Sequence, residues 1–145
     1  REEVFLNNAH VTFWQIDDRN DAGTPDGWGV SFSFAASNDD GWMPFLRGGW
    51  AHEGGSLYET SITTGFGYTP RPGQSLLGLG VNWNRPNAST YGASLDDQYS
   101  LELFQQLQLT EGVEITPNVQ VIRSPALEPS DDWSVFFGLR LRAAL

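Results

Sequence analysis

The chain has 145 residues, the size of one domain or part of one, with 18 Asp and Glu, 8 basic residues that are all Arg, and no Cys. A net charge of -10 argues against nucleic acid as a partner, and the lack of Cys excludes disulfides, thiolate nucleophiles and Cys-ligated zinc. Aromatic residues make up 13%, which indicates a folded chain. No run approaches the ~18 apolar residues of a membrane helix, a test that does not detect transmembrane strands.

Short alternating segments dominate the chain. Gly (16 residues) and Pro (8 residues) interrupt it at short intervals, and helical periodicity is scarce, as in an all-β protein. Period-2 alternation predicts eight strands, near residues 10–16, 28–37, 42–51, 57–69, 76–84, 98–109, 113–123 and 133–145.

The predicted connections alternate in length. Tight turns are expected at 38–41, 71–74 and 110–112, and longer polar loops at 17–27, 52–56, 85–97 and 124–132. One smooth rim and one loop-rich rim are typical of outer-membrane barrels, which have short periplasmic turns and longer external loops. Eight strands then place the start of the first and the end of the last at the smooth rim.

Each predicted strand has one apolar and one polar face. In the last strand, for example, Leu139 and Leu141 alternate with Arg140 and Arg142. The first strand is ambiguous, because both of its faces carry apolar residues; these are Val11 and Phe13 on one face and Trp14 and Ile16 on the other.

Trp and Tyr are sorted along the apolar faces. Six lie at strand ends beside a longer loop, namely Trp28, Trp50, Tyr58, Trp83, Tyr99 and Trp133, while Trp42 and Tyr68 lie beside a tight turn. Two aromatic levels on an apolar surface are typical of the two interfaces of a bilayer. A soluble sandwich alternates too, but its core does not sort aromatics in this way. The pattern favours an all-β, antiparallel up-and-down transmembrane β-barrel.

Six short stretches carry a resemblance to a known family. They are Pro25-Asp26-Gly27-Trp28-Gly29, Trp42-Met43-Pro44-Phe45-Leu46-Arg47-Gly48-Gly49, Gly80-Val81-Asn82-Trp83-Asn84-Arg85-Pro86, Asp97-Gln98-Tyr99, Ile115-Thr116-Pro117-Asn118-Val119-Gln120 and Phe137-Gly138-Leu139-Arg140. Together and in this order they resemble the C-terminal half of the carbohydrate-selective porins, the OprB family of Gram-negative outer membranes.

The resemblance implies that residues 1–145 are the C-terminal part of a single porin barrel of about 16 strands. It also implies passive diffusion of small carbohydrates such as glucose, with outer-membrane lipid, the remaining N-terminal half of the barrel and further copies of the chain as partners. We expect any export signal to lie upstream of Arg1. Two residues depart from the pattern: Leu145 stands where an aromatic residue commonly ends such proteins, and Gln105 lies among lipid-facing Leu residues.

The inward-facing side chains are the candidates for lining a lumen. Opposed charges and amides offer a polyhydroxy solute many hydrogen bonds, and an inward aromatic ring offers a face for the C–H surface of a sugar. The candidate lining residues are Arg47, Arg140, Arg142, Glu59, Glu102, Asn82, Gln106, Phe104 and Phe136. A competing interpretation of the charged residues is that they form structural ion pairs on a barrel wall. A competing interpretation of the aromatic rings is that they anchor a loop or the missing half of the barrel.

No catalytic, cofactor or metal site is predicted. His10 and His52 lack triad partners. The acidic loop at 17–23 does not match the spacing of a calcium loop, so solvated loop charge is the expected role of its Asp residues.

Two other functions remain open from the sequence. One is a soluble or secreted β-sandwich carbohydrate-binding module that uses its Trp residues. The other is a small eight-stranded structural or adhesive outer-membrane barrel. Many inward residues are Gly or Ser, too small to fill an eight-stranded lumen, so we expect a wider pore whose first and last strands here do not pair with each other.

Overall fold

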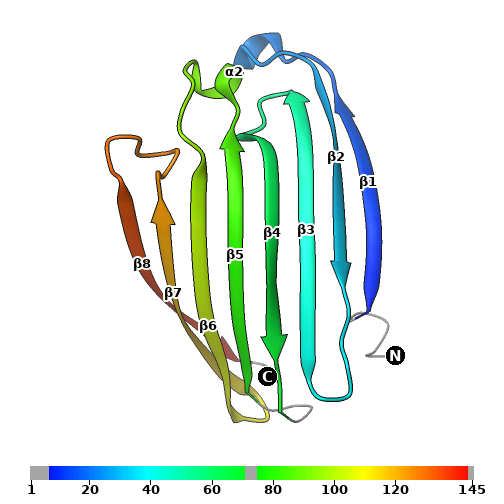
Figure 1. The fold of residues 1–145 in the computed structure, drawn as a ribbon, viewed down its shortest axis with the longest axis vertical. Coiled ribbons are helices and arrows are strands. Elements are labelled where there is room, and N and C mark those ends of the chain that lie inside the picture. Colours follow the sequence, from blue (N-terminus) through cyan, green and yellow to red (C-terminus); the bar gives the residue numbers. More distant parts are fainter. Residues whose placement is uncertain (1–6, 71–74, 144–145) are drawn as a thin grey trace.

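A computed structural model describes residues 7–70 and 75–143, which form one antiparallel sheet of eight strands (Figure 1). Each strand pairs with its neighbours along the chain, in the order β1 to β8. The strands are β1 (Asn8–Ile16), β2 (Gly27–Ala35), β3 (Trp42–Glu53), β4 (Tyr58–Tyr68), β5 (Leu76–Pro86), β6 (Gln98–Thr110), β7 (Val113–Arg123) and β8 (Trp133–Ala143). The predicted all-antiparallel meander is confirmed.

The two rims of the sheet differ as predicted (Figure 1). One carries the longer connections, including the short helices η1 (Asn20–Ala22) and α2 (Ala88–Tyr91). The other carries the tight turns, and β1 begins and β8 ends there. The turn expected at 71–74 lies outside the described residues. No helix in the described part of the chain is long and apolar enough to cross a membrane.

The strand ends depart from the prediction in places. The loop predicted at 52–56 begins two residues later than expected, because β3 continues to Glu53 and four residues separate it from β4. Glu53, Gly54 and Gly55 take φ values of 51°, 68° and 71°, so the chain reverses there in left-handed conformations that Gly adopts at low cost. The strand predicted at 28–37 ends earlier, at Ala35. Residues 144 and 145 of the last predicted strand lie outside the described residues.

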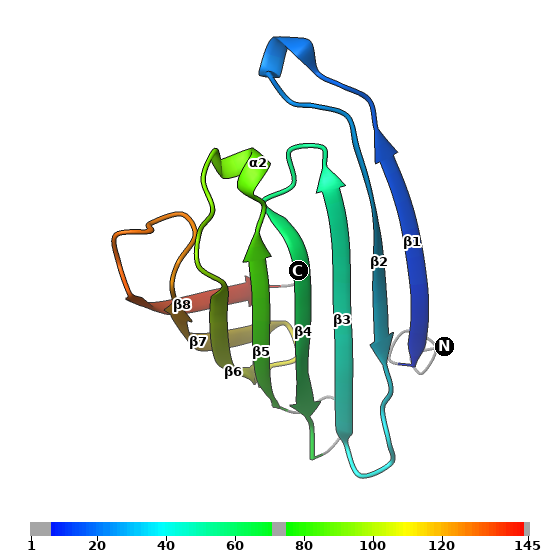
Figure 2. The same ribbon diagram turned by 45° about the horizontal axis from the view of Figure 1, so that its top comes forward.

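Exposure is inverted relative to a water-soluble sheet. On β5, Val81 is 46% exposed while Asn84 is 5% exposed, and on β6 Leu103 is 42% exposed while Gln98 is 8% exposed. The described chain buries no Val, Leu, Ile, Met or aromatic residue, and Ala35, Ala51 and Ala126 are the Ala residues that it buries. The sheet curves strongly from β1 to β8 (Figure 2), and its polar face is the more enclosed one. A polar concave face and an apolar convex face are typical of a membrane barrel wall with a wet interior.

The β1 ambiguity is resolved by the register with β2. Phe13 pairs with Val30 and is 79% exposed on the convex face, whereas Trp14 pairs with Gly29 on the concave face. A Cβ at Gly29 would lie 2.6 Å from the Trp14 ring, so this Gly makes room for an inward Trp.

Aromatic clusters mark both levels of the convex face. At the loop-rich rim Trp28 and Trp50 meet edge-on with their ring centroids 4.9 Å apart. At the tight-turn rim the ring centroids of Trp42 and Tyr68 are 4.7 Å apart. The register also places Gln105 on this face, opposite Leu77, as the sequence predicted.

The sheet has two free edges, β1 and β8, which are not paired with each other in the described residues. The β-sandwich alternative is wrong, because one sheet contains all eight strands and consecutive strands pair without a Greek key. The chain therefore forms an open, curved wall.

Candidate functional site

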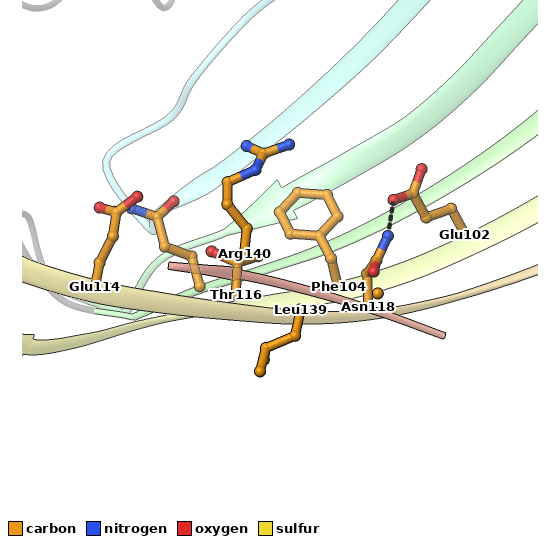
Figure 3. A pocket seen from close by; sticks show the side chains of 9 residues that line it. Glu102, Phe104, Glu114, Thr116, Asn118, Leu139 and Arg140 are labelled. Atoms are coloured by element: carbon orange, nitrogen blue, oxygen red, sulfur yellow. Dashed lines mark hydrogen bonds between the residues drawn. The ribbon is translucent and has the colours of Figure 1, made fainter. Parts of the chain in front are cut away.

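The concave face holds two hollows with polar side chains, one toward the β8 edge of the sheet and one toward the β1 edge. The Arg140 hollow lies over β6, β7 and β8 (Figure 3), and it is lined by Glu102, Phe104, Gln106, Glu114, Thr116, Asn118, Gly138, Leu139 and Arg140. The Arg47 hollow lies over β1 to β4, and it is lined by Asn8, His10, Ser31, Phe32, Ser33, Arg47, Gly48, Gly49, Ser61 and Thr63. Four of the nine predicted lining residues meet in the first hollow, and a fifth lies in the second.

Arg140 is the central cation of its hollow. It lies opposite Thr116 in the register, and its side chain rises on the same side of the sheet as Glu114 and Phe104, while Leu139 points the other way (Figure 3). Within the described residues, the guanidinium of Arg140 forms no ion pair and therefore has no carboxylate partner.

The two carboxylates of this hollow are held by amides. Asn118 Nδ2 donates to Glu102 Oε1 at 2.9 Å, and Gln106 Nε2 donates to Glu114 Oε2 at 2.8 Å. Each amide fixes one carboxylate oxygen and leaves the other as an acceptor. The hollow thus presents fixed acceptors and a free guanidinium within one patch.

Arg142 differs from Arg140, although both lie on the same face of β8. Its Nη1 is 3.7 Å from Glu114 Oε2, while its side chain is 70% exposed. The ion-pair interpretation therefore applies to Arg142.

Arg47 lies at the middle of β3 in a hollow without carboxylates. The register places it between Ser33 and Thr63, and its Cζ lies 5.5 Å from the centre of the Phe45 ring. A guanidinium at this distance from a ring makes a cation–π contact, which leaves its positive charge uncompensated. The adjacent hydroxyls add neutral donors and acceptors.

Asn82 faces inward as predicted, but its amide is occupied within the wall. Its Nδ2 donates to Thr63 Oγ1 at 2.7 Å, to Ile62 O at 3.2 Å and to Ser61 Oγ at 3.3 Å. Its Oδ1 accepts a hydrogen bond from Asn84 Nδ2. The structure therefore makes Asn82 a brace between β4 and β5.

Arg142 and Asn82 line neither hollow, and the same is true of two further predicted residues, Glu59 and Phe136. Glu59 occupies a bulge in the β4–β5 pairing, between Tyr58 and Thr60, near the loop-rich rim. Phe136 pairs with Gln120 on the edge strand β8 and is 55% exposed.

Several lining residues were not among the predicted candidates. In the Arg140 hollow Thr116 adds a hydroxyl beside the guanidinium, and His10, Ser33 and Thr63 join Arg47 in one cross-strand row. Alternation assigns Ser33, Thr63 and Thr116 to the inner face but leaves His10 on the ambiguous first strand undecided, and only the register shows which residues are neighbours.

A third hollow lies between the two long loops at 87–97 and 124–132. Asp96, Asp131 and Asp132 line it. Within the described ranges, no group of three metal-ligating side chains is close enough to hold an ion.

The single curved meander, its enclosed polar face and its aromatic-bordered apolar face define the wall of an outer-membrane type of β-barrel. The chain belongs to the carbohydrate-selective porin, OprB family, whose sequence model matches residues 6–145. The resemblance inferred from the sequence is thereby confirmed.

A solved structure, the high-pH structure of Pseudomonas putida OprB, resembles this chain with a TM-score of 0.64 at 16% sequence identity. The match covers 81% of this chain and 35% of that one, so this chain corresponds to about a third of that structure. At this identity the likeness shows the fold alone. Comparison with curated proteins gives no significant match.

Proposed function

We propose that this chain is part of the wall of an outer-membrane channel in a Gram-negative bacterium, through which small carbohydrates diffuse passively. The observation that carries the proposal is the inverted polarity of the sheet, with amides and charges on the enclosed face and Leu, Val and Phe exposed on the other. Membership of the carbohydrate-selective porin family supports the substrate class. Passive diffusion requires positioned hydrogen-bonding groups and no catalytic residue.

The Arg140 hollow suits a polyhydroxy solute. Sugar hydroxyls both donate and accept, so they complement the free donors of Arg140 and the free oxygens of Glu102 and Glu114. Phe104 offers an apolar ring beside these polar groups, and the C–H face of a pyranose fits such a ring. We propose glucose as a substrate of this channel.

The free edges require a partner in a membrane. Backbone groups along β1 and β8 have no water to bond with in hydrocarbon, and a barrel wall must close. We propose that the remaining half of a porin barrel, the N-terminal half of about 16 strands in total, pairs with both edges. Whether barrels associate further as homo-oligomers is a separate part of the proposal, tested by the mass of the detergent-solubilised protein.

The test is permeation through the full-length protein in liposomes. Swelling in glucose, compared with protein-free liposomes, is expected to increase, and glucose is expected to reduce the ion current in planar bilayers. Absence of both effects in correctly folded protein would overturn the proposed function. Detergent-free solubility of the full-length protein would argue against the membrane location.

A further inference from the structure

Within one inward-facing row, strands β5 to β8 carry two bulky side chains between two Gly residues. Consecutive register partners place Gly78 on β5, Phe104 on β6, Asn118 on β7 and Gly138 on β8 side by side. The two bulky side chains in the middle are thus each flanked by a position without a Cβ.

Phe104 and Asn118 lean in opposite directions over these Gly residues. A Cβ on Gly78 would overlap Cε1 and Cζ of Phe104, so the ring fills the space above β5. A Cβ on Gly138 would overlap Asn118 Oδ1 and lie 3.0 Å from its Cγ, so that amide fills the space above β8. Both side chains line the Arg140 hollow, which remains open above β6 and β7 (Figure 3).

We propose that Gly78 and Gly138 are size-determining positions of the channel, acting through Phe104 and Asn118. Without Cβ atoms, they let both side chains fold away from each other, and this sets the width of the Arg140 hollow. A Cβ at either position would push its neighbour back over the hollow. This inference rests on the proposed function, because the quantity it sets is the size of sugar that passes.

A matched control lies two residues away on the same strand and face. A Cβ on Gly80 meets a single atom, Phe45 Cζ, at 3.9 Å, an ordinary van der Waals distance. Gly80→Ala therefore adds the same methyl group to β5 without displacing a ring.

The experiment compares a monosaccharide, glucose, with a disaccharide, maltose, in liposome swelling by the full-length protein. Gly78→Ala and Gly138→Ala are each expected to lower the maltose-to-glucose rate ratio by about twofold or more, because a narrower passage obstructs the larger solute more. Gly80→Ala is expected to leave the ratio unchanged. A wild-type ratio in Gly78→Ala would overturn the inference.

Double variants separate a change of width from a general structural defect. If Gly78→Ala acts through the ring, it is expected to have no further effect on the ratio in a Phe104→Ala background, and Gly138→Ala likewise in an Asn118→Ala background. If Gly78→Ala lowered the ratio equally in the wild-type and Phe104→Ala backgrounds, the inference would be overturned. If the Gly78→Ala protein does not assemble, adding Phe104→Ala is expected to restore its assembly. Failure of the double variant to assemble would also count against the inference.

The proposed function is tested separately by the wild-type protein. If the wild type passes no sugar, the proposed function and this inference both fail. If it passes glucose and maltose but the ratio is insensitive to Gly78→Ala and Gly138→Ala, only the inference fails.

Discussion

The two hollows of the concave face are built around the same residue type in opposite surroundings. Arg47 has hydroxyls and a Phe ring beside it and no carboxylate in its hollow. Arg140 shares its hollow with two carboxylates, each fixed by an amide. Among the described residues, the guanidinium of Arg47 is therefore far from carboxylates, whereas the unpaired guanidinium of Arg140 shares its hollow with two of them. Replacing Arg47 is therefore expected to change mainly the ion preference, and replacing Arg140 is expected to change mainly the contact with sugar.

The largest effect is expected from reversing the charge of Arg47. Because no carboxylate compensates it, Arg47→Glu is expected to raise the cation-to-anion permeability ratio by about tenfold, since a fixed charge in a narrow passage sets the entry barrier for ions. Reversal potentials of the full-length protein in a salt gradient measure the ratio. Arg47→Lys keeps the charge and is the control. An unchanged ratio in Arg47→Glu would show that Arg47 does not set the ion preference.

Arg140→Ala is expected to show the converse, a weaker sugar contact with a smaller change in ion preference. Loss of its donors is expected to raise the glucose concentration for half-block of the ion current by about threefold to tenfold, equivalent to one or two hydrogen bonds. Leu141→Ala is the control, because this residue of β8 lies on the apolar face and outside the hollow. Equal block in Arg140→Ala and wild type would contradict a solute-binding role for Arg140.

Replacing Asn82 tests whether an inward-facing amide binds the solute or stabilises the wall. Asn82→Ala removes its hydrogen bonds to β4 and leaves the amide of Asn84, which is 5% exposed, without its acceptor. We expect a loss of about 1–3 kcal/mol in the free energy of unfolding, with unchanged glucose block. Urea unfolding followed by fluorescence measures the first and bilayer recordings the second. Weaker block with unchanged stability would return Asn82 to the solute-binding set.

The fold could be predicted from the sequence because a period of two displays both faces of a strand directly. Leu139 and Arg140 are assigned to opposite faces by alternation alone, and the structure agrees. The end of β3 was misjudged, because the reversal depends on positive φ values at Glu53 and its two following Gly residues. Such backbone conformations are not visible in a hydrophobicity pattern.

The site could be predicted only as a set of inward residues. Their grouping depends on the register between strands, which places Arg140 beside Thr116 and sets Glu59 apart at a bulge. Whether a polar group is free also depends on cross-strand neighbours, as with Asn82 and Thr63. Alternation carries no information on either point, because it describes one strand at a time.

The smallest effect is expected from Arg142, whose pairing with Glu114 spans 3.7 Å while its side chain is 70% exposed. Water screens such a pair, so Arg142→Ala is expected to cost less than about 1 kcal/mol in the free energy of unfolding. Glucose block is expected to stay at the wild-type value, because Gln106 still holds Glu114 at 2.8 Å. Glu114→Ala is the informative comparison, since it deprives both Gln106 and Arg142 of their acceptor and is expected to destabilise the protein more. If Arg142→Ala instead weakened block as much as Arg140→Ala, the solute-binding patch would extend along β8 toward the tight-turn rim, and the contrast between a free and a paired guanidinium on this strand would not hold.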